Sequence, residues 1–162
     1  MEMKTNRTRV LALAVVAASF VLGGRAAAQA CPNGCTFQPV IPCRVVDTRI
    51  GVLPNGGGPV TNDWQNPRLF AMRGNCGIPS NAVAVSVTLT AANPPSAGYL
   101  SIWPAGEAWP FISNLNFSGG ESAVANGAVV KLGPTQGPDL ACFSGTTSPM
   151  HVVIDVVGYF KP

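Results

Sequence analysis

The clearest pattern in the chain is an alternation of large apolar and small side chains over positions 82–90. Val83, Val85, Val87 and Leu89 alternate there with alanine, serine and threonine. A period of two residues is typical of a β-strand that turns one face to a core and the other toward solvent. These positions therefore predict a half-buried strand.

The run at 151–160 predicts a different kind of strand, because most of its residues are apolar on both faces. Such a strand belongs in the centre of a sheet and is covered on both sides. Shorter strands, separated by turns rich in proline and glycine, are expected at 44–49, 68–73, 98–103, 113–117, 123–132 and 140–143. The set predicts an all-β fold, an antiparallel β-sandwich of about eight strands, with a closed β-barrel as the alternative.

The first thirty residues follow another pattern. Basic residues precede an apolar run of 13 residues from Val10 to Leu22, and Ala-Gln-Ala follows at 28–30. This order is typical of a secretory signal peptide. We expect cleavage before Cys31, which leaves residues 31–162 as a single secreted β domain, extracellular or at the cell surface.

Two other fates of this segment are less favoured. A retained membrane span needs about 20 apolar residues, more than this run supplies. A lipid on Cys31 is the second alternative. However, a lipidation site has leucine where this chain has Ala28, and a small residue where it has Gln29. We therefore expect neither anchor.

The net charge and the composition of residues 31–162 differ from those of the whole chain. Residues 31–162 hold six basic and six acidic side chains, so the net charge of +3 comes from the first thirty positions. A neutral domain has no electrostatic footprint for nucleic acid or an anionic membrane. All 15 prolines and 16 of the 18 glycines also lie after position 30, which favours short strands and turns over long helices.

All five cysteines follow the signal, at 31, 35, 43, 76 and 142. In an exported protein this number predicts one or two disulfides and a leftover thiol. Cys31 and Cys35 flank Pro-Asn-Gly, a tight turn that would allow a local bridge. No second short cysteine pair or nearby histidine completes four ligands, so we expect no metal site.

A series of short motifs follows in order along the chain: Pro42-Cys43-Arg44, Asp47-Thr48-Arg49, Cys76-Gly77-Ile78-Pro79, the strand at 82–90, Gly98-Tyr99-Leu100, Ser113-Asn114-Leu115-Asn116-Phe117, Ala125-Asn126 and Ile154-Asp155-Val156-Val157-Gly158-Tyr159-Phe160. The series resembles a domain found in secreted bacterial proteins, alone or in tandem, often beside hydrolase or adhesion modules. The resemblance implies an extracellular accessory β domain and supplies no catalytic residue. It also favours a Cys43–Cys76 disulfide, because both cysteines lie in shared motifs, with Cys31–Cys35 as the second bridge. Since the chain ends two residues after the last motif, we expect a stand-alone copy.

Asp155 is the most unusual charge, because it lies inside an apolar strand where an unpaired carboxylate is costly. We expect a buried ion pair with Arg49 or Arg44, close to Asp47, that fixes strand register, or else hydrogen bonds from several backbone N–H groups. Replacing Asp155 with alanine would then cost about 3 kcal/mol or more. A polar-ligand or calcium site near Asp47 is the alternative.

The sequence gives little support for an enzyme or a cofactor. His151 is the only histidine, and no Gly-x-Ser-x-Gly turn presents a nucleophile. The six acids suggest no glycosidase pair. The glycines at 56–58 lack the Lys-Ser/Thr of a phosphate loop and precede no helix. A small secreted hydrolase is thus a remote alternative.

Aromatic side chains carry the leading functional hypothesis. Exposed flat rings of extracellular β domains can stack on sugar rings, with nearby amides directed at sugar hydroxyls. The candidate ligand residues are Trp103, Tyr99, Trp109, Asn114 and Asn116, with Trp64, Asn62 and Asp63 as further candidates. The competing interpretation is that the tryptophans fill half-buried slots at the ends of the sandwich.

Together these features predict an extracellular, non-enzymatic binding or structural module. In one version of this hypothesis, the module binds polysaccharide through these aromatic and amide side chains. The main alternative is a surface or adhesion protein that associates with itself, or with another surface protein, through edge strands or the odd cysteine.

Overall fold

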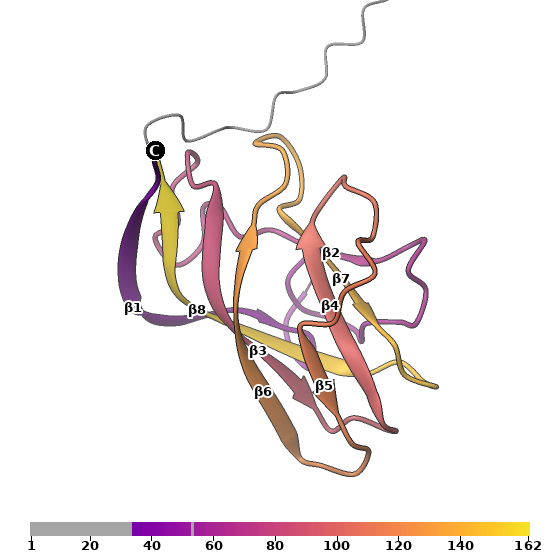
Figure 1. Cartoon of the computed structure of the whole chain (residues 1–162). Helices are drawn as coiled ribbons and strands as arrows, with labels where there is room; N and C mark the ends of the chain where they lie inside the picture. Colours follow the sequence, from indigo (N-terminus) through magenta and orange to yellow (C-terminus); the bar gives the residue numbers. More distant parts are fainter. Residues whose placement is uncertain (1–33, 53) are drawn as a thin grey trace, which may run out of the picture.

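A computed structural model describes residues 34–52 and 54–162 and shows an all-β protein (Figure 1). Within these residues there is no helix. The eight strands are β1 (Thr36–Asp47), β2 (Arg68–Phe70), β3 (Ala84–Ala92), β4 (Gly98–Pro104), β5 (Leu115–Phe117), β6 (Ala123–Lys131), β7 (Leu140–Ser144) and β8 (His151–Lys161). The predicted signal peptide and its cleavage site lie outside the described residues.

The strands form two four-stranded antiparallel sheets. The first sheet has the order β1-β8-β3-β6 and the second has the order β2-β7-β4-β5, and neither closes into a barrel. The predicted antiparallel sandwich is therefore confirmed. None of the described residues forms an apolar helix of membrane-spanning length.

The period-two pattern of β3 is confirmed, because Val85, Val87 and Leu89 are buried while the residues between them are partly exposed. β8 is central in its sheet, as its apolar sequence predicted. Its outer face is only partly covered, since Asp155 and Val157 remain half-exposed. β1 begins at Thr36, well before the strand expected at 44, because prolines obscured its start in the sequence. An edge strand tolerates prolines, and the ladder with β8 is irregular between Pro39 and Cys43.

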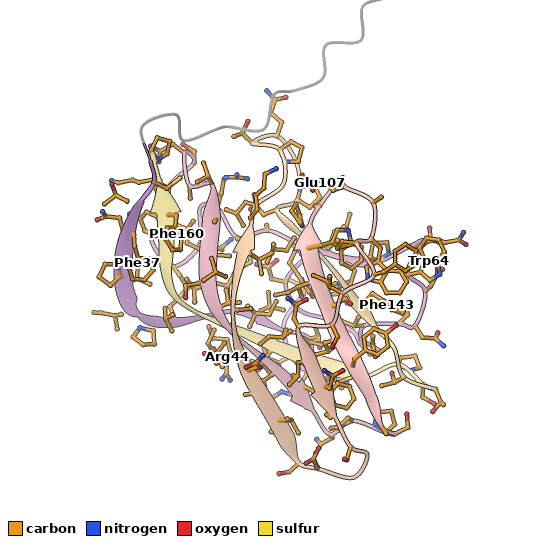
Figure 2. The ribbon with its side chains drawn as sticks, in the orientation of Figure 1. Phe37, Arg44, Trp64, Glu107, Phe143 and Phe160 are labelled. Atoms are coloured by element: carbon orange, nitrogen blue, oxygen red, sulfur yellow. A yellow bond between two sulfur atoms is a disulfide. The ribbon has the colours of Figure 1, made fainter. Side chains whose placement is uncertain are left out.

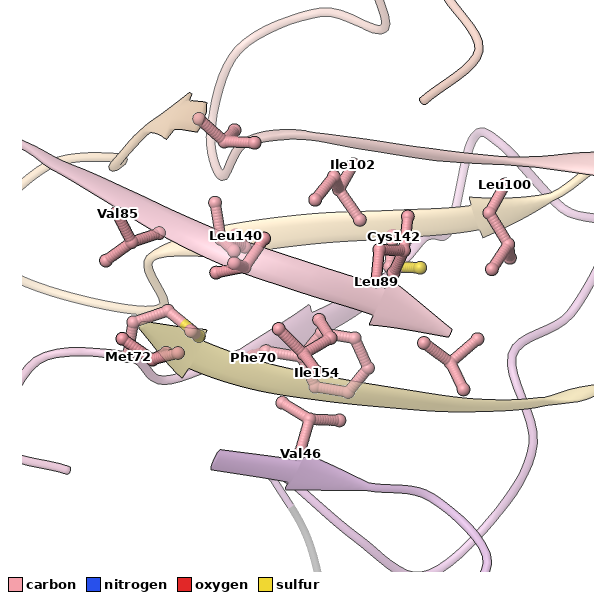
Figure 3. Close-up of a cluster of buried hydrophobic side chains, with 14 of the residues drawn as sticks. Val46, Phe70, Met72, Val85, Leu89, Leu100, Ile102, Leu140, Cys142 and Ile154 are labelled. Atoms are coloured by element: carbon pink, nitrogen blue, oxygen red, sulfur yellow. The ribbon is translucent and has the colours of Figure 1, made fainter. Parts of the chain in front are cut away.

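The core lies between the sheets (Figure 3). Val46, Val85, Leu89 and Ile154 from the first sheet meet buried side chains of the second sheet, which are Phe70, Leu100, Ile102, Leu140 and Cys142. Burial of these apolar side chains is the main force that holds the sheets together, because each one removes its surface from water.

The cysteines divide into bonded and free. Cys43 and Cys76 form a disulfide with 5.8 Å between their Cα atoms, which ties β1 to the loop before β3 and confirms the predicted pair. Cys35 is also disulfide-bonded, and its predicted partner Cys31 lies outside the described residues. Cys142 is free and fully buried, and burial raises the pKa of its thiol to about 12. This thiol is therefore shielded from a bridge between chains.

A buried ion pair joins two loops that the sequence analysis did not connect. Asp139 is 2% exposed and accepts hydrogen bonds from the backbone N–H groups of Met72 (2.6 Å) and Arg73 (2.7 Å) and from the guanidinium of Arg73. The same guanidinium donates to the carbonyls of Ala82 and Gly133, at 2.9 and 3.1 Å. The cluster fixes the loop after β2 against the connection between β6 and β7.

Candidate functional site

The outer face of the second sheet carries a layer of aromatic side chains that is separate from the main core. Tyr99, Ser101 and Trp103 share the outward face of β4, because the inward face belongs to Leu100 and Ile102. On β7, Ala141 and Phe143 lie in register with Trp103 and Ser101, so the outward rows of the two strands meet. Trp103, Ala141 and Phe143 are buried there, outside the sandwich core, and Tyr99 and Trp109 pack against them.

Two loops add an exposed layer on top of Phe143. The loop before β2 supplies Trp64, and the loop between β4 and β5 supplies Trp109 and Phe111. The ring of Trp109 lies with its centroid 5.1 Å from Phe143, 4.5 Å from Phe111 and 5.8 Å from Trp64. Figure 2 shows Trp64 and Phe143 on the same side of the molecule, away from Phe37 and Phe160 of the first sheet.

We call Trp64, Trp109 and Phe111 the aromatic patch. Trp64 is 45% exposed, Phe111 is 79% exposed and Trp109 is half-buried between them. Trp109 is inclined by 36° to each of its two neighbours, so the three rings form a tilted row and not one plane. The exposed faces therefore belong chiefly to Trp64 and Phe111.

Ser101 anchors the loop that carries Trp109 and Phe111. Its buried hydroxyl donates to the carbonyl of Ile112 and accepts a hydrogen bond from Trp109 Nε1 at 3.3 Å. Asn114 secures the end of the same loop, because its Oδ1 accepts from the Ile102 N–H at 2.8 Å and its N–H donates to Leu100 at 2.9 Å. The loop is thus held against β4 before any ligand arrives.

Phe111 has a backbone φ of 57°, in the left-handed region. A side chain with a Cβ pays about 1–2 kcal/mol for this conformation, and glycine usually occupies it. Here the position holds a phenylalanine whose ring is mostly exposed, so core packing does not account for the residue. Strain of this kind often occurs at binding sites.

The loop that carries Trp64 is ordered by its own side chains. Asp63 accepts hydrogen bonds from the N–H of Gln65 (3.0 Å), the N–H of Asn66 (3.2 Å) and Asn66 Nδ2 (2.8 Å). The bonds from Asn66 lower the pKa of the Asp63 carboxyl, so it is ionised at neutral pH. Thr61 joins the loop to the end of β7, where its carbonyl accepts from the Ser144 N–H at 3.1 Å.

The five candidate ligand residues from the sequence occupy different environments. Trp103 is 2% exposed and donates from Nε1 to the Glu107 carbonyl at 2.9 Å, so it fills a slot and offers no free face. Asn114 is used within the fold, as described. Tyr99 is half-buried, edge-on to Phe143 at 5.8 Å, and covers Gly145, where a Cβ would collide with its ring.

The remaining two candidates are better placed. Trp109 is at the centre of the patch, and Asn116 is exposed on β5, in register with Tyr99, where its Oδ1 accepts from Ser113 at 2.9 Å. Phe111 was missed by sequence reasoning. The available signal was an apolar Trp-Pro-Phe-Ile segment at 109–112 inside a loop that otherwise looks polar and turn-rich.

A cluster of charged side chains lies on the outer face of the first sheet, apart from the aromatic patch. Asp155 accepts from Arg44 Nε at 2.9 Å and Nη2 at 3.2 Å, whereas Arg49 pairs with Asp47 at 2.7 Å. Arg44 also lies 3.5 Å from Asp47, so it bridges the two acids. The side chains of Arg44 and Asp155 are 51% and 29% exposed, so this pair is more exposed than the sequence suggested.

This cluster borders an open groove of about 620 Å³, lined by Pro42, Cys43, Arg44, Thr88, Asp155 and Val157. The hydrogen bond from Arg49 lowers the pKa of Asp47 to about 2. Among the described residues, no three or more of His, Cys, Asp and Glu gather as a metal site would require. The charges of the cluster satisfy one another, which leaves the aromatic patch as the stronger candidate site.

His151 lies at the start of β8 beside Thr48. The Thr48 hydroxyl accepts from the Val152 N–H at 2.8 Å and lies 3.2 Å from His151 Nδ1. Thr48 is buried, so the pair ties the end of β1 to the start of β8 and presents no accessible hydroxyl.

Comparison with known protein families gives no match, and neither does comparison with curated proteins or with solved structures. The resemblance seen in the sequence motifs therefore stays a prediction, and the function must be argued from the geometry of the chain itself.

Proposed function

We propose that this chain is an exported, non-enzymatic binding module that holds polysaccharide on the aromatic patch. The observation that carries the proposal is Phe111, whose ring is 79% exposed although its backbone is held at a φ of 57°. A strained loop that displays an aromatic ring to water has no role in packing the core. Its use is explained if the ring meets a ligand.

The chemistry of the patch fits sugar rings. The apolar faces of sugars pack on exposed aromatic faces, here those of Trp64 and Phe111, and bury apolar surface without needing a charge. Exposed side-chain amides that could donate to sugar hydroxyls are those of Asn62 and Gln65, on the loop that carries Trp64, and of Asn116 on β5. Both loops are anchored in advance, which lowers the entropy cost of binding.

Export rests on two supports. The Cys43–Cys76 disulfide is typical of an oxidising compartment outside the cytosol. The basic, apolar and small-residue order of positions 1–30 is that of a signal peptide removed before Cys31. On this view the module acts at the cell surface or beyond it.

Self-association through the same patch is a second candidate function. Ile112 is exposed next to Phe111, and together they extend the apolar surface beyond the rings. Exposed aromatic residues are common at the centres of protein interfaces. Because the free thiol of Cys142 is buried, we do not expect it to form a disulfide between two copies of the chain.

The test is intrinsic tryptophan fluorescence of the purified protein, titrated with soluble polysaccharides and cell-wall fragments. We expect a saturable shift with at least one polymer. In Phe111→Ala or Trp64→Ala the affinity should fall about tenfold, which corresponds to about 1.4 kcal/mol. Ile41→Ala is the matched control, because Ile41 is 89% exposed on β1 of the other sheet, and it should bind as the wild type does.

The opposite result is equally informative. If no polymer shifts the fluorescence, the polysaccharide proposal is wrong. If sedimentation then shows a dimer that Phe111→Ala dissociates and Ile41→Ala does not, the patch is a self-association surface.

A further inference from the structure

The charges around the aromatic patch restrict its ligand further, an argument that rests on the proposed function. The charged group beside Trp64 in the chain is Asp63, whose carboxylate is fixed by three hydrogen bonds from Gln65 and Asn66. These bonds fix the orientation of a negatively charged, exposed side chain directly before Trp64 in the chain. Any ligand on this ring therefore approaches a fixed negative charge.

Among the described residues, every cation is either paired with a carboxylate or directed elsewhere. Four of the six arginines and lysines in the described part of the chain already have carboxylate partners, in the pairs Arg44–Asp155, Arg49–Asp47, Arg73–Asp139 and Lys131–Glu107. The other two are Arg68 and Lys161. Lys161 is at the end of β8, in register with Thr36 of the first sheet, and so belongs to the opposite layer.

Arg68 is close to the patch in sequence but faces away from it. On β2, Arg68 and Phe70 share the inward face, with the guanidinium carbon 5.6 Å from the Phe70 ring centroid, whereas Leu69 between them is exposed. The guanidinium donates to backbone carbonyls of the loop at 54–59, including that of Gly58 at 2.7 Å. Both terminal nitrogens are therefore committed to that loop, and the remaining nitrogen, Nε, is buried without a hydrogen-bond partner among the described residues.

We propose that the aromatic patch selects neutral polysaccharides and rejects acidic ones. Neutral sugar rings stack on Trp64 and Phe111 without a counter-charge. Carboxylate or sulfate groups would instead approach Asp63, and the described residues place no unpaired guanidinium or ammonium beside it, although such pairing is what makes anion recognition strong.

The experiment compares neutral and acidic polymers of matched length on the purified protein. The probes are a neutral β-glucan and a galactomannan against polygalacturonate and alginate, each titrated at low and at physiological ionic strength. We expect a neutral polymer to bind at least about tenfold more tightly than either acid. Its affinity should change by less than about twofold between the two salt conditions, because no charge pairs form.

Asp63→Asn sharpens the test, because asparagine retains the turn-forming side-chain oxygen and removes the charge. This variant should narrow the ratio between neutral and acidic affinities at low salt, because acidic polymers no longer approach a negative charge. Glu121→Gln, which removes an exposed acid on the loop between β5 and β6, is the matched control and should change neither.

Acidic polymers that bind as tightly as neutral ones, with an affinity that falls steeply with salt, would overturn the selectivity but leave polysaccharide binding intact. Absence of binding to every polymer would overturn both proposals together. The two failures are therefore distinguishable.

Discussion

On the outer face of the first sheet, Arg44, Asp155 and Thr88 form a row in register across β1, β8 and β3, and the row is open to solvent. On the outer face of the second sheet, Trp103 and Phe143 are buried under a loop that Ser101 holds in place. On the first face, oppositely charged side chains pair with one another at the solvent-exposed surface. On the second face, a loop covers the apolar side chains, and the aromatic rings of the loops form the new outer surface. An exposed aromatic surface thus arises where a sheet face is covered by a loop and not by another sheet.

The largest expected effect is that of Trp103→Ala. Removing this buried ring should lower the free energy of unfolding by about 3–5 kcal/mol, because its loss leaves a cavity under the loop. Denaturant unfolding followed by circular dichroism measures it. Trp64→Ala removes an exposed ring and should cost less than about 1 kcal/mol. Equal losses in the two variants would mean that the second face is not divided into a buried and an exposed layer.

A smaller effect is expected for Asp155→Ala on the first face. The sequence alone suggested about 3 kcal/mol or more, but Arg44 and Asp155 are 51% and 29% exposed, which reduces the expected loss to about 1 kcal/mol. Asp139→Ala is the buried counterpart and should cost about 3 kcal/mol or more, because it leaves Arg73 without its partner. The same unfolding assay compares them, and a larger loss for Asp155→Ala would contradict this ranking.

The first face should also respond to acid. The pKa of Asp47 is lowered to about 2 by its hydrogen bond from Arg49, so the folded state favours the ionised carboxylate. A lowered pKa contributes stability that is complete above the unfolded value of about 4 and is lost as the pH falls toward 2. The melting temperature of the wild type should therefore fall more steeply between pH 4 and 2 than that of Asp47→Asn. Parallel curves would show that Asp47 contributes nothing to this slope.

A small effect on stability is also expected at Phe111, where two substitutions can separate stability from binding. Phe111→Gly should be about 1 kcal/mol more stable than Phe111→Ala, because glycine adopts a positive φ without steric cost. Both variants lose the ring and should lose polysaccharide affinity equally. Thermal melts and fluorescence titrations provide the two readouts. A glycine variant less stable than the alanine variant would argue against strain at this position.

The features that could be predicted from the sequence are those that depend on a local two-residue period. In β3 the alternation of valine and leucine with smaller residues reports burial directly, and the two-residue period also placed Tyr99 and Trp103 on one face of a strand. It could not show that a loop folds back over that face and buries Trp103. Likewise, Asp139 and Arg73 are 66 positions apart, and nothing near either residue signals the other. Such pairs form only when distant loops are brought together by the fold.

The pairing of the first and last strands has a mechanical consequence. Thr36 lies opposite Lys161, so the chain enters and leaves the domain at neighbouring points of one antiparallel ladder. A force that pulls these two ends apart loads one pair of strand residues at a time, as in a zipper, and resistance is low at first. The separation of β1 from β8 then reaches Cys43, whose disulfide to Cys76 holds the strand to the body of the domain. Under tension the N-terminal side would thus yield a short length of chain before the load on β1 passes through the disulfide to the loop before β3.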